Sequence, residues 1–370
     1  MSPDAIPAAQ AGAKLTVDLA ALADNWRLLD ARSGAAECAA VVKADAYGVG
    51  LEPAARALWA AGARTFFVAH VFGAIRLRAL LPEATIYVLN GLPPGSAGLF
   101  LAHRLRPVLG SLDEIADWRD AALGRNDAEP AAVHLDTGLN RLGLEAHELG
   151  MARDALADVK LALAMSHFAS SEFPDHPANA RQIADFGLMR RAFPGLPGSL
   201  ANSSGIFLPQ RPHEDLVRPG YALYGGNPTP HAANPMRPVV KLEARIIQTR
   251  WAEDGEKVGY NGVWTARGRR KLATISLGYA DGLPRAAMGA DEAAGGEAIV
   301  DGVRCPFAGR VSMDLIVLDV TAAPRARRGD DVEILGDAIT VDDLGGRAKT
   351  IGYEILTNLG RRYARTYRGG

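Results

Sequence analysis

One alternation governs residues 37–226: a short run of β-forming apolar residues, then a stretch with helical spacing, eight times over. The apolar runs occupy residues 37–42, 65–70, 85–91, 106–110, 131–138, 161–169, 198–205 and 215–226. Strands that alternate with helices form parallel sheets, and eight such units predict closure into a (β/α)8 barrel. An open doubly wound sheet is the alternative. It is disfavoured because no Gly-x-Gly-x-x-Gly follows the first strand.

The pattern changes after residues 227–238, where helical spacing stops and strand-like pieces separated by glycine-rich turns take over. Asp-Gly pairs at 254–255 and 301–302 are typical of tight hairpins. We therefore expect three parts: an N-terminal tail at 1–13, the barrel at 14–235, and a mostly β domain at 236–370. A leading strand predicted at 14–18 precedes the first barrel strand and is compatible with either domain.

Charge and composition exclude several classes of function. The 370 residues carry a net charge of −1, which argues against nucleic acid and anionic membranes as partners. No apolar run is long enough to span a bilayer, and the first residues lack the basic start and apolar core of a secretory signal. Cys38 and Cys305 are too few for a disulfide framework. These features predict a reduced, cytoplasmic protein.

The ends of five predicted barrel strands carry polar residues. In a (β/α)8 barrel the functional residues stand at the C-terminal strand ends, and phosphate often binds beyond strands seven and eight. Here those ends bear Lys43 and Tyr47, Asp136 and Arg141, His167, Asn202 with Ser203 and Ser204, and Arg218 with Gly220 and Tyr221. Taken singly, each has an ordinary interpretation as a rim lysine, a structural histidine, a helix N-cap or a glycine turn. Those interpretations do not explain why all of them fall on one rim.

A lysine beside an anion-binding rim predicts a pyridoxal phosphate site. Ser203 or Ser204 at the start of a helix, together with backbone N–H groups near Gly220, would cradle a phosphate. The cofactor forms a Schiff base with a lysine and acts as an electron sink. Lys43 must be neutral to react, and a barrel mouth that holds other cations depresses the pKa of a lysine.

The motifs around these residues resemble those of the bacterial alanine racemase family, in order and over nearly the whole chain. They read "VVKADAYGVG", "HLDTGLNRLG", "MSHFAS", "ANSSG", "VRPGYALYG", "VGYNGVWT", "ISLGYADGLPR", "GRVSMDL" and "GYEILTNLGRRYARTY". The resemblance implies a (β/α)8 barrel with a C-terminal β domain, a head-to-tail homodimer, pyridoxal phosphate, and interconversion of L-alanine and D-alanine. It also implies that the product D-alanine feeds peptidoglycan synthesis.

The resemblance also assigns roles to residues of this sequence. Lys43 matches the Schiff-base lysine, which is also the base on the D face, and Tyr260 matches the base on the L face, delivered from the partner subunit. Arg218 matches the arginine at the pyridine nitrogen, and His167 the histidine that supports it and the tyrosine base. Further cofactor contacts are implied for Tyr47, Asn202, Ser203, Gly220, Tyr221 and Tyr353. Substrate contacts or the substrate entrance are implied for Arg141, Met313, Asp314 and Tyr279, and no metal site is expected.

One position departs from the family pattern. Some members carry, seven residues before the arginine of the "DTG" motif, a carbamylated lysine that holds that arginine. Here the position is His134, where no carbamate forms. Arg141 must therefore be oriented otherwise, with neighbouring Asn140 as a candidate.

Racemisation explains why these residue types are needed. A proton leaves one face of Cα and returns to the other, so two bases must flank a planar intermediate. A tyrosine, with an ordinary pKa of about 10, needs nearby positive charge to act as a base, which His167 and Arg218 are expected to provide. Arginine gives up a proton with difficulty, so Arg218 leaves the ring nitrogen unprotonated. We infer that this weaker electron sink trades rate for fidelity by suppressing transamination.

Three other functions stay open from the sequence. A same-fold amino-acid decarboxylase would pair the pyridine nitrogen with an acid, which Arg218 disfavours. A related racemase for lysine, arginine or serine is harder to separate, although its periplasmic members tend to carry a signal and a disulfide. Met313 and the tyrosine-lined entrance favour alanine. A non-enzymatic pyridoxal phosphate-binding protein resembles the barrel alone and has no use for the β domain.

Overall fold

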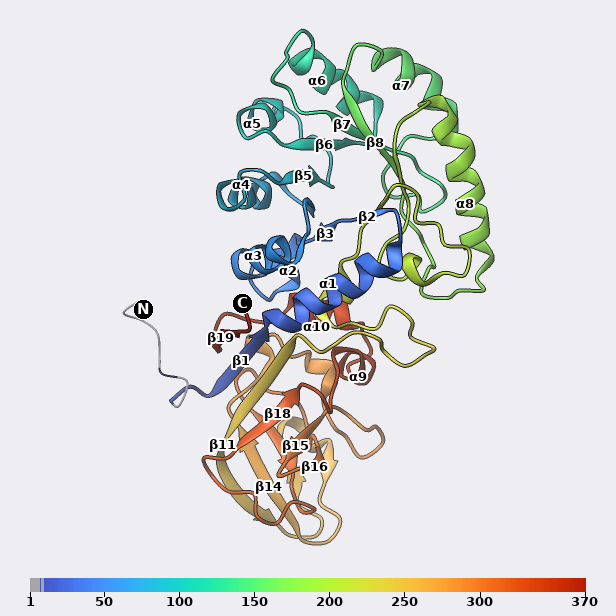
Figure 1. The fold of residues 1–370 in the computed structure, drawn as a ribbon. Helices are drawn as coiled ribbons and strands as arrows, with labels where there is room; N and C mark the ends of the chain where they lie inside the picture. Colours follow the sequence, from blue (N-terminus) through green and yellow to red (C-terminus); the bar gives the residue numbers. More distant parts are fainter. Residues whose placement is uncertain (1–6, 8–9) are drawn as a thin grey trace.

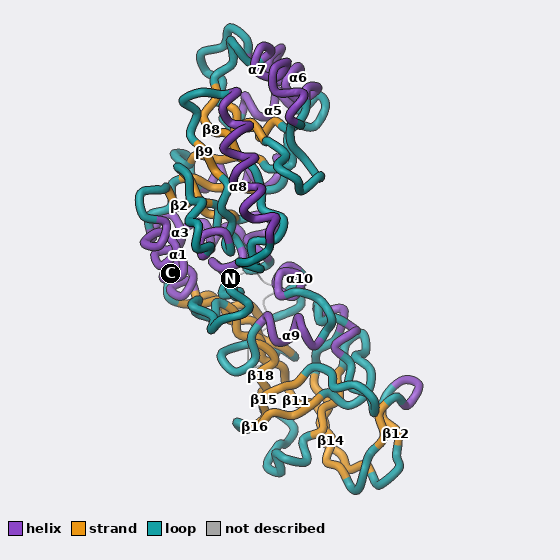
Figure 2. Tube along the Cα trace, turned by 90° about the vertical axis from the view of Figure 1, so that its right-hand side faces the viewer, coloured by secondary structure: helices purple, strands orange, loops and turns teal. Residues whose placement is uncertain are grey.

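The computed structural model describes residue 7 and residues 10–370, and it shows two lobes joined at a seam (Figures 1 and 2). Residues 1–6 and 8–9 of the predicted N-terminal tail lie outside the described residues. The upper lobe in Figure 1 alternates parallel strands with helices, and the lower lobe is built mainly from antiparallel strands. The predicted fold class, a barrel followed by a mostly β domain, is confirmed.

Eight strand positions close the barrel in the described part of the chain, and the first is split at Ala39 into two pieces. The bounds are β2 Glu37–Cys38, β3 Ala40–Val41, β4 Thr65–Val68, β5 Thr85–Val88, β6 Arg106–Leu109, β7 Ala131–His134, β8 Leu161–Met165, β9 Gly198–Ser199 and β10 Leu216–Val217. β3 to β9 form one parallel sheet, and β10 pairs in parallel with β2. A bridge between Asn202 and Arg218 joins the last two positions, so the ring of strands is closed.

The strands end sooner than the apolar runs predicted. β7 stops at His134, β8 at Met165 and β9 at Ser199, and the residues beyond them form loops at the barrel mouth. Asp136 and Asn202 lie just past two of these ends, and their side chains accept backbone N–H groups of the following residues. Such local bonds compete with a strand ladder and turn the chain away from it.

The helices of the barrel lobe cover the outside of the strands (Figure 1). Their bounds are α1 Leu19–Ser33, α2 Lys43–Tyr47, α3 Leu51–Ala61, α4 Val71–Leu80, α5 Ala97–Ala102, α6 Leu112–Ala122, α7 Leu149–Ala155 and α8 Pro177–Met189. Side-chain caps begin three of them: Asp18 accepts the N–H of Ala21, Ser111 that of Glu114 and His176 that of Ala178. Within the described residues, none of the helices has the length and apolar character needed to cross a bilayer.

The second lobe contains a sheet in the order β16-β15-β18-β11-β1-β19, extended by β14 and β17. Its strands are β1 Ala13–Asp18, β11 Val240–Ala252, β12 Lys257–Val258, β13 Trp264–Thr265, β14 Arg270–Ile275, β15 Glu297–Val300, β16 Val303–Pro306, β17 Ile316–Asp319, β18 Asp331–Leu335 and β19 Ala364–Arg368. The leading strand β1 joins this sheet, antiparallel to β11 and parallel to β19. Two short helices, α9 Val341–Arg347 and α10 Gly352–Thr357, lie where the sequence indicated strands and turns.

The two Asp-Gly pairs have different outcomes. Asp301 and Gly302 have φ values of 49° and 78° and join β15 to β16 in an antiparallel hairpin, as predicted. The hairpin prediction at 254–255 is wrong, because β11 pairs with β14 whereas β12 pairs with β13. The turn at 254–255 therefore connects strands of different pairs.

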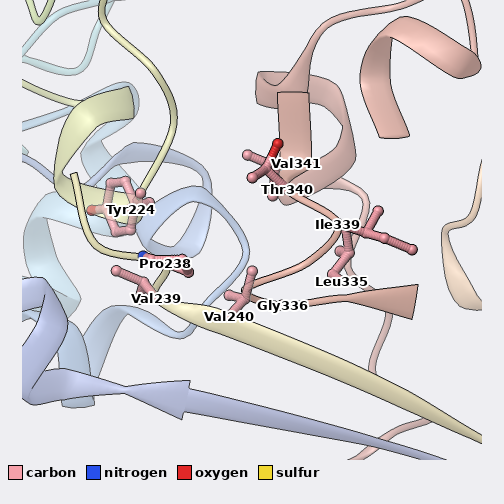
Figure 3. A pocket seen from close by; sticks show the side chains of 10 residues that line it. Tyr224, Pro238, Val239, Val240, Leu335, Gly336, Ile339, Thr340 and Val341 are labelled. Carbon is pink, nitrogen blue, oxygen red and sulfur yellow. The ribbon is translucent and has the colours of Figure 1, made fainter. Parts of the chain in front are cut away.

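The two lobes pack directly against each other at the seam. Asn25 of α1 donates from Nδ2 to the carbonyls of Leu223 (3.1 Å) and Arg237 (2.9 Å), which lie on the connection into β11. A cavity of about 10 Å³ lies at this seam, and Figure 3 shows the side chains that line it. Its lining residues are Tyr224, Gly225, Pro238, Val239, Val240, Leu335, Gly336, Ile339, Thr340 and Val341. That volume is enough for about one water molecule, so side chains fill the seam.

Candidate active site

Four charged or titratable residues predicted for the barrel rim come together at its mouth. Lys43 follows β3, Arg141 lies in the loop after β7, His167 follows β8 and Arg218 follows β10. Arg141 and Arg218 both lower the pKa of Lys43, and all three residues lower that of His167. They therefore share one electrostatic environment, which is dominated by positive charge.

Lys43 begins a left-handed turn. The φ angles of Ala44, Asp45, Ala46 and Tyr47 are 54°, 55°, 55° and 52°, and Gly48 continues at 81°. Left-handed backbone costs a residue with a side chain roughly 1–2 kcal/mol, so four in succession store on the order of 4–8 kcal/mol. Strain of this kind persists only where the surrounding structure holds it, and it is common at functional sites. The sequence predicted a turn of small residues here but not its handedness.

Arg218 is a buried cation held by neutral groups. Its side chain is 4% exposed, and its guanidinium donates to Ser199 Oγ, to the carbonyl of Ser166 and, at 3.5 Å, to the carbonyl of Leu200. No carboxylate of the described residues pairs with it, and burial lowers its pKa to about 9. The structure records no hydrogen bond from His167 to Arg218, so the holding partners are Ser199 and two carbonyls. A desolvated cation of this kind favours a hydrogen-bond acceptor next to its guanidinium.

Hydroxyl and N–H groups converge at the end of strand eight. Ser203, which is buried, accepts the N–H groups of Gly220 (3.0 Å) and Ala222 (3.2 Å) at its Oγ. A Cβ on Gly220 would lie 2.3 Å from the hydroxyl of Tyr47, so only glycine allows this approach. The resulting corner of donors is suited to an anion.

Tyr353, which belongs to the β domain, packs beside these donor groups. Its ring stacks on that of Tyr221 with centroids 3.8 Å apart, and its centroid lies 6.2 Å from that of Tyr47. The Tyr221 hydroxyl donates to Asp342 Oδ1 (2.6 Å), and Asp342 Oδ2 accepts the N–H of Asn227 (3.0 Å). Asp342 belongs to α9, so these bonds tie the β domain to the loop after strand eight.

The Asn202 side chain forms hydrogen bonds within the loop at the barrel mouth. Its Oδ1 accepts the N–H of Gly205 (2.8 Å) and the hydroxyl of Ser171 (2.9 Å). These bonds fix the turn before Gly205 but are not an N-cap, because the short 3₁₀ turn at Gly205–Phe207 follows Ser204 and has no side-chain cap. Because Oδ1 is engaged, only the Nδ2 group of Asn202 is available for the predicted cofactor contact.

Burial and neighbouring cations lower the pKa values of the titratable groups at the mouth. The Lys43 side chain is exposed to the open mouth, but the surrounding walls desolvate it, so its pKa is lowered from 10.5 first by this desolvation and then by Arg141 and Arg218. Burial is also the main reason why the pKa of His134 falls to about 4 and that of His167 falls well below its ordinary value. A pKa lowered in this way makes His167 a poor source of the positive charge expected for a tyrosine base, and that role stays a prediction. Arg218 remains the cation at that position.

Asp136 organises the loop that carries Arg141. Its Oδ1 accepts the N–H groups of Gly138 (2.9 Å) and Leu139 (3.0 Å), and its Oδ2 accepts that of Asn140 (3.0 Å). Asn140 therefore takes part through its backbone, with φ at 54°, rather than through its side chain. The Arg141 side chain is exposed at the mouth.

The other predicted residues lie on the surface of the β domain. The turn that carries Tyr279 is hydrogen-bonded to the backbone beside Met313 at 2.9–3.0 Å, and Arg362 donates to Asp314 (2.7 Å). Tyr260 follows β12 and is 68% exposed. Figure 2 shows β12 at the outer edge of the β domain, separated from the barrel lobe. The structure thus brings Tyr279, Met313 and Asp314 together but does not bring Tyr260 to Lys43 of the same chain.

Sequence reasoning missed several residues that hold the site, among them Ser199, Asp342 and Arg362. Ser199 lies within the predicted seventh strand. Its complete burial, which only the structure shows, indicates that its hydroxyl has a polar partner inside the barrel. Asp342 sits beside a capping box formed by Thr340 and Asp343, which marks a helix start and nothing more. Its partner Tyr221 is 121 positions away, so no local pattern indicates the contact.

The residues at the mouth fit a phosphate-bearing pyridine cofactor. Lys43 is accessible and its pKa is lowered, Arg218 is a buried cation without an acidic partner in the described chain, and the corner at Gly220 offers N–H and hydroxyl donors. Among the described residues, no group of three or more His, Cys, Asp or Glu side chains is arranged to hold a metal ion.

Comparisons with known proteins agree over almost the whole chain. The family model of the alanine racemase N-terminal domain matches residues 17–228, and that of the C-terminal domain matches residues 239–367. The chain is 59% identical over 360 residues to an alanine racemase of Methylobacterium nodulans, with 96% of each chain covered. It is 52% identical to that of Acidiphilium cryptum, with 95% of this chain and 97% of the relative covered.

Solved structures show the same likeness. The crystal structure of alanine racemase from Bartonella henselae with covalently bound pyridoxal phosphate has a TM-score of 0.91 at 38% identity, covering 96% of this chain and 99% of that one. The biosynthetic alanine racemase from Pseudomonas aeruginosa also has a TM-score of 0.91, at 33% identity, covering 97% of this chain and 100% of that one.

Proposed function

The chain belongs to the alanine racemase family, and we propose that it interconverts L-alanine and D-alanine by proton transfers at opposite faces of Cα. It is an isomerase with pyridoxal phosphate as its cofactor. One observation carries the proposed mechanism: Lys43 stands on a strained turn beside a buried Arg218 that has no acidic partner among the described residues. We further propose that the D-alanine supplies peptidoglycan synthesis.

The mouth would hold the cofactor at both ends. The N–H of Gly220 and the hydroxyls of Tyr47, Ser203 and Tyr353 suit the phosphate, because they form or flank the donor corner. Arg218 suits the ring nitrogen, which it would leave unprotonated. When bound, pyridoxal phosphate withdraws electrons from Cα and makes its proton acidic.

Lys43 would take and return the proton on the D face. A base must be neutral to accept a proton, and burial, Arg141 and Arg218 all lower the pKa of Lys43 toward that state. The carbonyls that accept from Arg218 keep its guanidinium fixed, so its charge stays at one position during the transfer. This arrangement favours proton exchange at Cα over protonation of the cofactor.

Tyr260 of a partner subunit would take and return the proton on the L face. Within one chain Tyr260 is exposed and follows β12, which lies at the outer edge of the β domain (Figure 2), so we infer that a second copy brings it to Lys43. We therefore propose a head-to-tail homodimer with shared active sites. Arg141 would bind the substrate carboxylate together with the Met313 backbone, while Tyr279 and Asp314 would line the entrance.

Chiral analysis of the products from a panel of L-amino acids, with and without added pyridoxal phosphate, tests this function. We expect D-alanine from L-alanine and little product from lysine, arginine or serine. Lys43→Ala should lose both turnover and the visible absorbance of the bound cofactor. Lys160→Ala, which removes an exposed lysine just before β8 at the other end of the barrel, should keep both.

Two outcomes would contradict the proposal. A Lys43→Ala protein that kept the visible cofactor absorbance would show that another residue anchors the cofactor. Equal rates of racemisation for alanine and for a larger amino acid would show that the enzyme is a racemase of broader specificity.

A further inference from the structure

The left-handed turn of Lys43 is held from outside by the last strand of the chain. β19 lies parallel to β1 in the β-domain sheet, and Figure 1 shows it directly below α2 and α3. Arg365 Nη1 donates to the carbonyl of Gly48 (2.8 Å), and the Tyr367 hydroxyl donates to the carbonyl of Val49 (3.0 Å). Both acceptors immediately follow the strained residues, so these two bonds fix the end of the turn.

The same guanidinium reaches α10. Arg365 Nη2 donates to the carbonyls of Leu359 (3.2 Å) and Gly360 (2.9 Å), which lie just past the end of α10, the helix that carries Tyr353. The turn also packs closely against this helix, because a Cβ on Gly48 would lie 2.1 Å from the carbonyl oxygen of Leu356. Arg365 thus links the turn of Lys43 to the helix of Tyr353.

The turn needs this external support. Its own backbone hydrogen bonds are all local: the N–H groups of Ala46, Gly48, Val49 and Gly50 donate to the carbonyls of Val42 (3.0 Å), Ala44 (2.9 Å), Ala46 (3.2 Å) and Asp45 (2.9 Å). A right-handed helical turn would make local bonds of the same kind without the steric cost of left-handed backbone. Bonds to groups outside the turn are therefore what selects the left-handed form, in which Tyr47 packs against Tyr224 with centroids 4.7 Å apart.

We propose that Arg365 and Tyr367 are positioning residues that hold the Lys43 turn left-handed and so set where Lys43 exchanges its proton. Neither residue touches the reacting atoms, and both act through the backbone at Gly48 and Val49. The catalytic consequence rests on the proposed function, because it takes Lys43 as the base on the D face. The structural consequence, a stabilised turn, does not depend on that function.

Hydrogen–deuterium exchange of the holoenzyme tests the structural consequence. In Arg365→Gln, peptides covering residues 44–50 should exchange at least tenfold faster than in wild type, since the turn opens more often. Tyr367→Phe keeps the ring, loses one bond and should show a smaller increase. Arg368→Gln is the matched control: it lies on the same strand and pairs with Asp18, not with the turn, so exchange at 44–50 should not change.

Each result of that experiment bears on the proposal. Unchanged exchange at 44–50 in Arg365→Gln, or an equal increase in Arg368→Gln, would overturn it. If Arg365→Gln fails to fold, Tyr367→Phe decides, and wild-type exchange in that variant would overturn the proposal.

Isotope effects test the catalytic consequence. L- and D-alanine have equal free energies, so kcat/KM must be equal in both directions and cannot reveal which transfer slowed. With α-deuterated D-alanine the Arg365→Gln isotope effect should rise above wild type, because proton removal by Lys43 becomes more rate-limiting. With α-deuterated L-alanine it should not rise, and Arg368→Gln should match wild type in both cases.

A rise with the L enantiomer alone would overturn the assignment to Lys43. A wild-type protein that does not racemise alanine would instead refute the proposed function, and the exchange experiment would still decide whether Arg365 supports the turn.

Discussion

Tyr260→Phe separates catalysis from stability because it removes a hydroxyl from a side chain that is 68% exposed. No hydrogen bond of that hydroxyl is recorded within the described residues. Stability should therefore change by less than about 0.5 kcal/mol. Turnover should fall roughly 10²–10⁴-fold, the usual contribution of a positioned general base, which corresponds to about 2.7–5.4 kcal/mol in the barrier. Thermal unfolding and steady-state rates from L-alanine measure the two effects.

Mixing this variant with Lys43→Ala tests whether the two bases come from different chains. After free subunit exchange of equal amounts, about half of the dimers contain one chain of each kind. If each site takes Lys43 from one chain and Tyr260 from the other, one of the two sites in such a dimer is intact. About a quarter of all sites would then be active, measured as D-alanine formed once native mass spectrometry shows complete exchange.

A second mixture provides the control. Wild type mixed with the double variant Lys43→Ala/Tyr260→Phe should drop to about half of its initial activity as mixed dimers form, because neither of their sites keeps both bases. If each chain supplied both of its own bases, that mixture would keep its activity and the first mixture would recover none. Either result, with exchange demonstrated, would refute the two-chain site. Wild-type rates from L-alanine in Tyr260→Phe alone would refute the two-base mechanism.

Two further predictions follow from contacts at the mouth. Tyr221→Phe should destabilise the protein by about 1.5–3 kcal/mol, the range for hydrogen bonds to charged groups. It should also weaken cofactor binding, because the stacked Tyr353 loses an anchored neighbour; unchanged cofactor affinity in a binding titration would contradict that role. Lys43 combines with the cofactor only when neutral, so the association rate should rise with pH and level off below the ordinary lysine pKa of 10.5. In Arg141→Gln the plateau should move to higher pH, since removing a like charge raises the pKa of Lys43; a shift to lower pH in stopped-flow absorbance would contradict it.

The barrel and its rim were predictable because they depend on local patterns. Each strand–helix unit shows its own periodicity, and parallel strands of one sheet end on the same edge, so strand order alone places Lys43, His167 and Arg218 on one rim. The predicted strands were too long because apolar residues continue past the last ladder bond. Only the side-chain bonds of residues such as Asp136 show where the chain turns away.

The supporting contacts were not predictable because they join residues far apart in the chain. Tyr221 and Asp342 are 121 positions apart, and Gly48 and Arg365 are 317 apart. Propensity and spacing contain no information about such pairs. The lowered pKa of His167 was also not predictable, because burial, its main cause, depends on the packed mouth and not on neighbouring residues.

The handedness of the Lys43 turn explains why local rules fail at this point. Glycine would adopt the angles of residues 44–47 without strain, yet the chain has Ala44, Asp45, Ala46 and Tyr47 there. Glycine at position 47 would remove a ring that stacks on Tyr224 and a hydroxyl that approaches Gly220. Sequences usually break local rules where function requires it and compensate elsewhere.

Here the compensation comes from another domain. The bonds from β19 and the contact with α10 exist only when the β domain is folded against the barrel. A barrel without that domain would keep its strands but lose the groups that select the left-handed turn. The position of Lys43 is therefore a property of the two-domain chain, even though every residue of the turn belongs to the barrel.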